Sequence, residues 1–142
     1  MDLQKYTPHA LAVLRIVTAL LFIEHGTQKL FGFPAMPGAE GGAGAGGLPP
    51  LMLVAGILEV FGGLAILVGL FTRPVAFVLC GMMAYAYWFA HVAHGGFFPV
   101  LNGGDAAALF CFVFLLLVVA GPGKWAVDHV LRPGRMKAVP AS

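Results

Sequence analysis

Four long apolar stretches constrain the fold of this chain more than any other feature. They lie at about residues 9–33, 50–72, 74–94 and 105–122, each close to the roughly 20 residues that a membrane-spanning helix needs. Transmembrane β-strands would alternate in polarity, whereas Leu64 to Leu70 and Leu109 to Ala120 are continuously apolar. The sequence therefore predicts an all-α membrane protein: a four-transmembrane-helix bundle over residues 1–133, followed by a flexible tail over 134–142.

The composition agrees with a membrane protein and argues against other classes. Hydrophobic residues make up 60% of the 142 residues and charged residues 10%, whereas a soluble domain carries about 25% charged residues. The net charge of +2 offers no basic face for phosphates, so we expect no nucleic acid partner. Four spans leave no room for a separate catalytic domain, and the lipid bilayer is the expected surrounding.

The distribution of basic residues predicts the orientation in the membrane, which in a bacterium would be the inner (cytoplasmic) membrane. Four spans place both termini and the turn at Arg73 on one side, which then carries seven of the eight lysines and arginines: Lys5, Arg15, Arg73, Lys124, Arg132, Arg135 and Lys137. By the positive-inside rule both termini are cytoplasmic. The segment from Lys124 to Arg132 predicts a short amphipathic helix on the inner surface, and the glycine-rich segment from Pro34 to Pro50 an outer loop.

Several ionisable residues fall inside the spans, where each costs on the order of 3 kcal/mol unless it has a partner or a water-filled cavity. At 1.5 Å per residue, Glu24 lies roughly 10 Å inside the outer boundary and Glu59 lies near the midplane. We therefore expect acids and imidazoles from separate helices to converge in one pocket in the outer half. The candidate catalytic residues are Glu24, His25 and Glu59; the candidate ligand-binding residues are Gln28, Lys29, Tyr87, Trp88, His91, His94 and Asp105.

Most of these residues also have a structural interpretation. Lys29 fits a snorkelling side chain at the outer edge equally well. Asp105 is more typical of a helix N-cap or first-turn acid than of a catalytic group, and His91 is compatible with a hydrogen-bonded packing histidine. Glu24 and Glu59 are either functional or form interhelical polar clamps.

Two further patterns concern packing. Gly56 and Gly63 share a helix face with Glu59, beside Gly62, and small residues there would let a neighbouring helix approach closely and bury the acid. The aromatic residues at the outer end of the third span, which include Tyr87 and Trp88, fit an interfacial belt or a flat apolar wall for a quinone ring.

A metal site built from His25, His91, His94 and a carboxylate is possible, since imidazole suits zinc, copper and iron, but the signal is weak, and dithiol chemistry is not predicted. His91 and His94 have no matching pair elsewhere, and the Glu-x-x-His pair of diiron bundles is missing from the spans. Cys80 is expected about 10 Å from the inner boundary and Cys111 about 9 Å from the outer one, so that their heights differ by around 10 Å. A disulfide needs Cα atoms within about 7 Å, and both cysteines are interpreted as packing thiols.

Three separated patches resemble the DoxX family of small bacterial membrane proteins: Leu14 to Gly32 with its Glu-His-Gly-Thr-Gln-Lys run, Glu59 to Arg73, and Gly121 to Asp128. The residues that match the family pattern position by position are Arg15, His25, Gly26, Lys29, Glu59, Gly62 and Gly63. The resemblance implies a four-helix bundle described as an oxidoreductase component, with a namesake relation to a thiosulfate:quinone oxidoreductase subunit. Glu24 and the glycine-rich loop depart from that pattern.

The first hypothesis is a redox-associated accessory subunit that binds a quinone-like or other small apolar ligand in the outer half of the bundle. No flavin, haem or dithiol motif is readable, so no intrinsic cofactor is expected and electrons would come from a partner protein. The alternative is a non-enzymatic scaffold or anchor of a larger membrane complex, and a third is a small-solute or proton pathway. A homodimer or larger complex is expected from the glycine-lined faces.

Overall fold

The computed structural model describes residues 3–35 and 47–131, and every regular element in these ranges is helical. A short turn of helix, η1 (Gln4–Tyr6), precedes the first long helix. The elements that follow are α1 (Thr7–Phe31), α2 (Pro50–Val68), α3 (Thr72–Ala86), η3 (Tyr87–Val92), α4 (Ala93–Gly95), α5 (Pro99–Asn102), α6 (Asp105–Ala120) and α7 (Val127–Leu131). Most of the expected outer loop and the whole expected tail lie outside the described residues.

Within these ranges, three helical stretches are long and apolar enough to cross a membrane: Gln4–Phe31, Pro50–Val68 and Thr72–Gly95. The helix α6 is equally apolar but has 16 residues, or about 24 Å at 1.5 Å per residue. The prediction of an all-α membrane protein is confirmed. The third span combines α3 and α4 with a wider π-helical turn, η3.

Left-handed residues set several helix ends. Gly32 (φ 68°) ends α1 and Gly69 (φ 72°) ends α2, as expected where a Cβ would strain the chain. The second span therefore stops before residue 72. The predicted C-terminal helix was placed wrongly at its start: positive φ angles at Gly123 (69°) and Trp125 (55°) prevent a helix there, so α7 begins at Val127.

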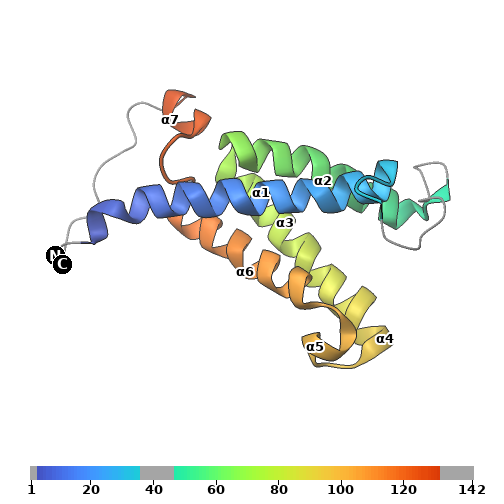
Figure 1. The fold of residues 1–142 in the computed structure, drawn as a ribbon. Helices are drawn as coiled ribbons and strands as arrows, with labels where there is room; N and C mark the ends of the chain where they lie inside the picture. Colours follow the sequence, from blue (N-terminus) through green and yellow to red (C-terminus); the bar gives the residue numbers. More distant parts are fainter. Residues whose placement is uncertain (1–2, 36–46, 132–142) are drawn as a thin grey trace.

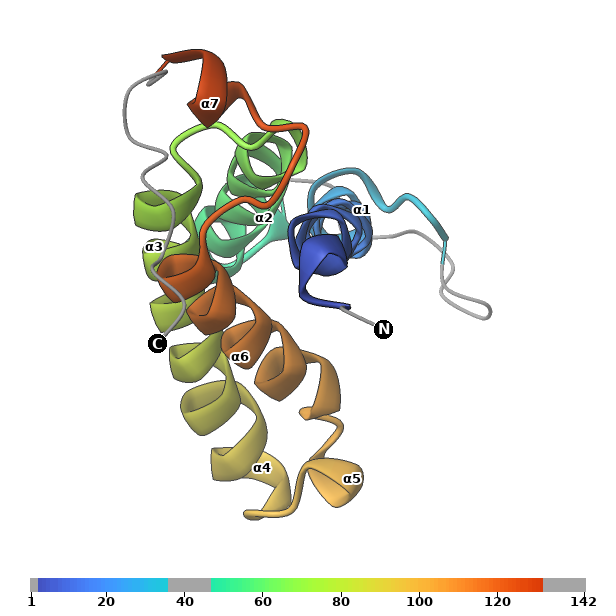
Figure 2. The same ribbon diagram turned by 90° about the vertical axis from the view of Figure 1, so that its left-hand side faces the viewer.

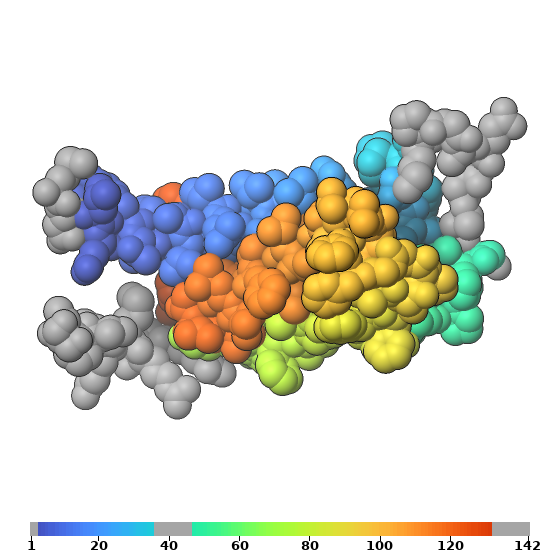
Figure 3. Space-filling model, turned by 90° about the horizontal axis from the view of Figure 1, so that it is seen from below, coloured from blue at the N-terminus to red at the C-terminus, as the bar shows by residue number. Residues whose placement is uncertain are grey.

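The long helices form two hairpins, α1 with α2 and α3 with α6, and the contacts between hairpins are fewer. The hairpins meet near α7 and diverge toward α4 and α5 (Figure 1). We call the α7 side the joined end and the opposite side the splayed end. The same division is visible after a quarter turn (Figure 2), and from below α1 runs beside α6 (Figure 3).

The core lies where the two hairpins meet. Phe22 of α1, Ile66 of α2 and Phe114 of α6 are fully buried, and the Phe22 and Phe114 rings meet edge to face at 4.9 Å between centroids. In contrast, large apolar side chains such as Phe61 and Phe112 are about two-thirds exposed, at 66% and 68%. Apolar exposure along the long helices suits a surface in contact with lipid.

Candidate functional site

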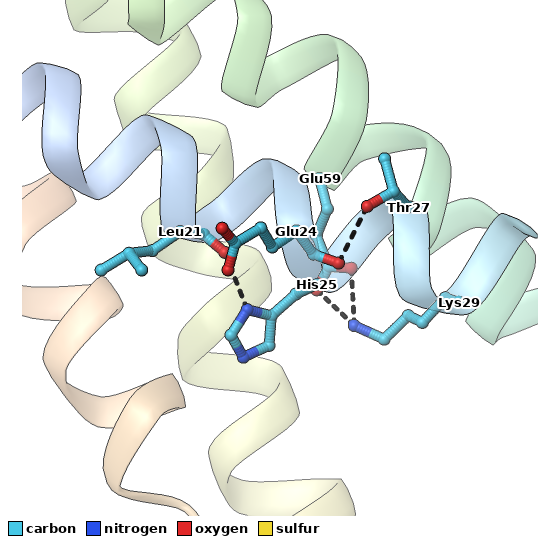
Figure 4. Close-up of polar contacts among 6 residues, drawn as sticks. All are labelled: Leu21, Glu24, His25, Thr27, Lys29 and Glu59. Carbon is cyan, nitrogen blue, oxygen red and sulfur yellow. Dashed lines mark hydrogen bonds and ion pairs between the residues drawn. The ribbon is translucent and has the colours of Figure 1, made fainter. Parts of the chain in front are cut away.

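An ion pair joins α1 to α2 toward the splayed end. Lys29 Nζ lies 2.5 and 2.6 Å from the two carboxylate oxygens of Glu59. The Glu59 side chain is 3% exposed and that of Lys29 25%. Lys29 therefore points to a buried carboxylate (Figure 4), and Glu59 has the partner that a charge in a span needs.

Glycines bring the two helices together around this pair. A Cβ on Gly26 would lie 2.9 Å from the backbone oxygen of Gly56, and one on Gly63 would lie 2.6 Å from Ile23 of α1. These distances are too short for any larger residue. The predicted close approach beside Glu59 is confirmed, whereas Gly62 instead faces Leu79 of α3.

His25 lies where the α1–α2 hairpin meets α6. Its Nδ1 donates a hydrogen bond to the backbone oxygen of Leu21 at 2.9 Å, which leaves Nε2 as the acceptor of a neutral ring. Its ring meets Phe110 of α6 edge to face at 5.5 Å, beside the contact of Phe22 with Phe110. The side chain is exposed, and no described residue is recorded as a partner of Nε2.

Glu24 and Gln28 flank His25 on α1. Glu24 is exposed; its backbone oxygen accepts a hydrogen bond from Thr27 Oγ1 at 3.1 Å, but its carboxylate has no hydrogen bond or ion pair with the described part of the chain. Gln28 Nε2 donates to the Pro34 backbone oxygen at 3.4 Å. In Figure 4 His25 and Lys29 extend on the same side of α1.

Tyr87 and His91 fasten the connection between the third span and α6. Tyr87 Oη donates to the backbone oxygen of Phe97 at 2.5 Å, and His91 Nδ1 donates to that of Asn102 at 3.1 Å. Because η3 is a π-helical turn, the residue spacing of an α-helix does not give the face of its side chains. The structure favours the packing interpretation of His91.

The other predicted residues of this hairpin are exposed. His94 Nδ1 donates to the backbone oxygen of Ala90 at 3.2 Å, and Trp88 lies among aromatic rings, 5.8 Å from Tyr87. Asp105 is a first-turn acid of α6 without a side-chain cap.

The predicted site residues thus form two groups, one on each hairpin. Lys29 and Glu59 are directly bonded, and His25 reaches the other hairpin through Phe110. The recorded hydrogen bonds of Tyr87, His91 and His94 stay within their own hairpin. Over residues 3–35 and 47–131 there is no group of three or more His, Cys, Asp or Glu that could hold a metal ion.

Sequence reasoning missed the part that Arg15 plays at the joined end. This side chain is fully buried, and its guanidinium donates to five backbone oxygens from two distant segments. The acceptors are Ile66, Leu67, Pro122, Lys124 and Trp125. Five donors in a planar fork suit arginine to this task. The sequence feature that could have predicted these hydrogen bonds is the presence of helix-ending glycines near residues 69 and 121, because a helix end leaves backbone carbonyl groups unpaired.

Two other charged residues complete the joined end. Asp128 of α7 accepts hydrogen bonds from the backbone N–H groups of Phe71 at 2.7 Å and Thr72 at 2.8 Å, and so caps the start of α3. Arg73 donates to the backbone oxygens of Val118 and Val119 at 2.7 and 2.8 Å. The segment 121–131, which includes α7, therefore packs across the ends of the long helices at the joined end (Figure 2).

The predicted separation of the cysteines is wrong. Cys80 Sγ and Cys111 Sγ lie 3.7 Å apart across α3 and α6. The prediction measured the two heights from opposite membrane boundaries. Measured from the joined end, Cys80 is eight residues past Thr72 and Cys111 nine residues before Ala120, so both lie at about 12–14 Å. The short length of α6 removes the expected offset.

The fold and the composition together define a multi-pass membrane protein built from two helical hairpins. Residues 10–92 match the model of the DoxX family. A Haemophilus influenzae protein that is itself uncharacterized is 48% identical over 131 residues, which cover 90% of this chain and 95% of that protein.

Two Escherichia coli proteins are also similar. Inner membrane protein YqjF is 34% identical over 84% of this chain and 89% of its own length, and inner membrane protein YphA is 29% identical over 86% and 90%. No solved structure matches the chain. The chain belongs to the DoxX family, and it is an inner membrane protein like these relatives.

Proposed function

We propose that the protein crosses the inner membrane four times, with both termini in the cytoplasm. Packing of α6 against α3 supports a fourth crossing, and local thinning of the bilayer can accommodate its shorter length. Arg15, Arg73 and Lys124 all belong to the joined end, which the positive-inside rule assigns to the cytoplasm. The α7 helix would then lie at the cytoplasmic interface. A C-terminal reporter that is active only in the periplasm should stay inactive; activity would refute this orientation.

Within this topology, we propose that the protein binds a small apolar ligand of the quinone class beside His25, as a redox-associated accessory subunit. The observation that carries the proposal is the state of His25. Its Nδ1 is hydrogen-bonded to Leu21 and its ring meets Phe110 edge to face. The residue is exposed within the α1 span, and its Nε2 has no partner in the described part of the chain. Because an unsatisfied polar group in hydrocarbon is costly, a ligand hydroxyl, such as that of a hydroquinone, can donate to Nε2 and pack beside the Phe110 ring.

Other predicted residues take different parts in this proposal. Glu24 is the next residue along α1, and its carboxylate has no partner in the described part of the chain; in this proposal it exchanges a proton with a hydroquinone hydroxyl. Glu59 is bound to Lys29, which favours the clamp interpretation over proton handling. His91, Tyr87, Trp88, His94 and Asp105 belong to the other hairpin and would contact a ligand only if it extends across to them.

The test compares two histidine variants. His25→Ala and His94→Ala each remove a histidine whose Nδ1 bonds to the backbone four residues earlier. Binding of a short-chain hydroquinone is measured in lipid nanodiscs without oxygen. His25→Ala should raise Kd about tenfold, the effect of one hydrogen bond, and His94→Ala should leave it unchanged. Equal Kd values for wild type and His25→Ala would refute the ligand site.

The second candidate function is a scaffold or anchor subunit of a larger membrane complex. Glu24 favours it, because this residue is exposed within the α1 span and its carboxylate has no partner in the described part of the chain, so that a helix of a second protein can cover it as well as a ligand can. Crosslinking from residue 24 with a photoreactive amino acid distinguishes the two. A protein adduct in native membranes would support the scaffold, and a lipid or quinone adduct would support the ligand site.

A further inference from the structure

Cys80 and Cys111 form a sulfur pair that sequence reasoning did not anticipate. Their Sγ atoms are 3.7 Å apart, and a disulfide requires about 2.05 Å. The gap of about 1.7 Å is within the range of small side-chain rotations. The pair joins α3 to α6, the two helices of one tightly packed hairpin.

The surroundings of the pair restrict what can react with it. Both cysteines are free and partly exposed, and both pack against the apolar core. At about 12–14 Å from the joined end, they lie within the membrane-spanning part of the hairpin. Charged oxidants such as glutathione disulfide are excluded from that depth, whereas a quinone dissolved in lipid can reach it.

We propose that Cys80 and Cys111 are a redox site that passes two electrons to a membrane quinone. Both S–H bonds break and one S–S bond forms. The two electrons and two protons released by the thiols reduce the quinone to a hydroquinone, so atoms and electrons balance. The choice of a quinone rests on the proposed function, while the pair itself rests on its own geometry.

The position of the pair relative to the proposed ligand site is consistent with this reaction. Cys111 directly follows Phe110, whose ring contacts His25. A quinone bound beside His25 would therefore lie next to α6, the helix that carries Cys111. The disulfide would bridge α3 and α6, which already pack together, so that the reaction would leave the hairpin arrangement intact.

The experiment treats the reduced protein in nanodiscs, without oxygen, with tetramethylbenzoquinone, which is fully substituted and resists addition of a thiol. We expect each chain to lose the mass of two hydrogen atoms and both titratable thiols, with one hydroquinone formed per chain. Cys80→Ser and Cys111→Ser should abolish all three changes. Glutathione disulfide should leave the wild type reduced.

Three results would overturn the proposal. Thiols that stay reduced with the quinone but are oxidised by a membrane-permeant azodicarboxamide would refute the quinone coupling. Thiols that resist both oxidants would refute the pair, and covalent dimers without an intrachain bridge would place the disulfide between chains. Quinone binding to the unreactive Cys80→Ser/Cys111→Ser double variant is measured separately, so that a failed ligand site and a failed redox site are distinguished.

Discussion

The joined end and the splayed end of the bundle differ in how far their charged residues and His25 are bonded within the chain. At the joined end, Arg15, Arg73 and Asp128 are bonded to backbone groups of neighbouring segments. At the splayed end, Lys29 and Glu59 are paired, but the Glu24 carboxylate and His25 Nε2 have no partner in the described part of the chain. Thr72 Oγ1 and His9 Nδ1 at the joined end are buried without a hydrogen-bond partner in the described part of the chain, so the comparison concerns the charged residues and His25. Those that are bonded within the chain hold the fold, and those that are not are available to a ligand or partner.

The largest expected effect comes from removing Arg15. Arg15→Met leaves five carbonyl oxygens without their donor, each at a cost of about 1–3 kcal/mol if it stays dry. Thermal unfolding in detergent should show a loss of more than about 3 kcal/mol in total. Arg15→Lys should rescue little, because one ammonium cannot reach both segments. If Arg15→Met unfolds at the same temperature as the wild type, the hydrogen bonds of Arg15 do not stabilise the joined end.

Separating Lys29 from Glu59 should come next. Glu59→Gln leaves a partly buried ammonium unpaired and should lower the free energy of unfolding by about 3 kcal/mol. The double variant Lys29→Met/Glu59→Leu should recover most of that loss in the same unfolding assay, because it buries neither charge. If the double variant folded normally but no longer bound the ligand, the Lys29–Glu59 pair would be part of the ligand site.

Close helix approach is tested by paired glycine variants. Gly26→Ala places a methyl group 2.7 Å from Val60 Cγ2 and should cost about 1–3 kcal/mol from overpacking. Gly81→Ala is the matched control, since a Cβ there meets nothing within 4 Å, and alanine should be neutral or slightly stabilising in the helix. Equal melting temperatures for the two variants would argue against tight α1–α2 packing.

The smallest effect concerns the helix cap. Asp128→Ala removes the acceptor for two backbone N–H groups at the start of α3 and should cost about 1 kcal/mol. Asp105→Ala, at the start of α6, removes an acid without a cap bond and should change stability less. The opposite ranking in thermal unfolding would show that α7 contributes little to the joined end.

The sequence predicted the class, the approximate spans and the glycine-lined approach at Glu59, because apolar length and small-residue spacing act locally along a helix. It did not predict which polar groups meet. Three of the five acceptors of Arg15 lie more than 100 residues away, at Pro122, Lys124 and Trp125, and nothing in the local pattern specifies those contacts.

The cysteine error has a different origin. Helix ends shift depth estimates, and α6 is shorter than the span assumed for it. A shift of a few residues, at 1.5 Å each, was enough to bring Cys80 and Cys111 to a similar height, where the prediction had separated them. Likewise, the π-helical turn at Tyr87–Val92 changes the directions of the His91 and His94 side chains from those expected of an α-helix. Convergence of polar side chains from the two hairpins in one pocket stays a prediction.

The contacts of Arg15 also bear on how the protein is made. The arginine enters the membrane with the first helix, yet three of its five acceptors lie at residues 122, 124 and 125 and are synthesised only after all four long helices. Until then its charge must be accommodated by water, the insertion machinery or the carbonyls at the end of α2. A nascent chain that ends before residue 122 would therefore hold an Arg15 guanidinium without three of its acceptors, which quality-control proteases could recognise.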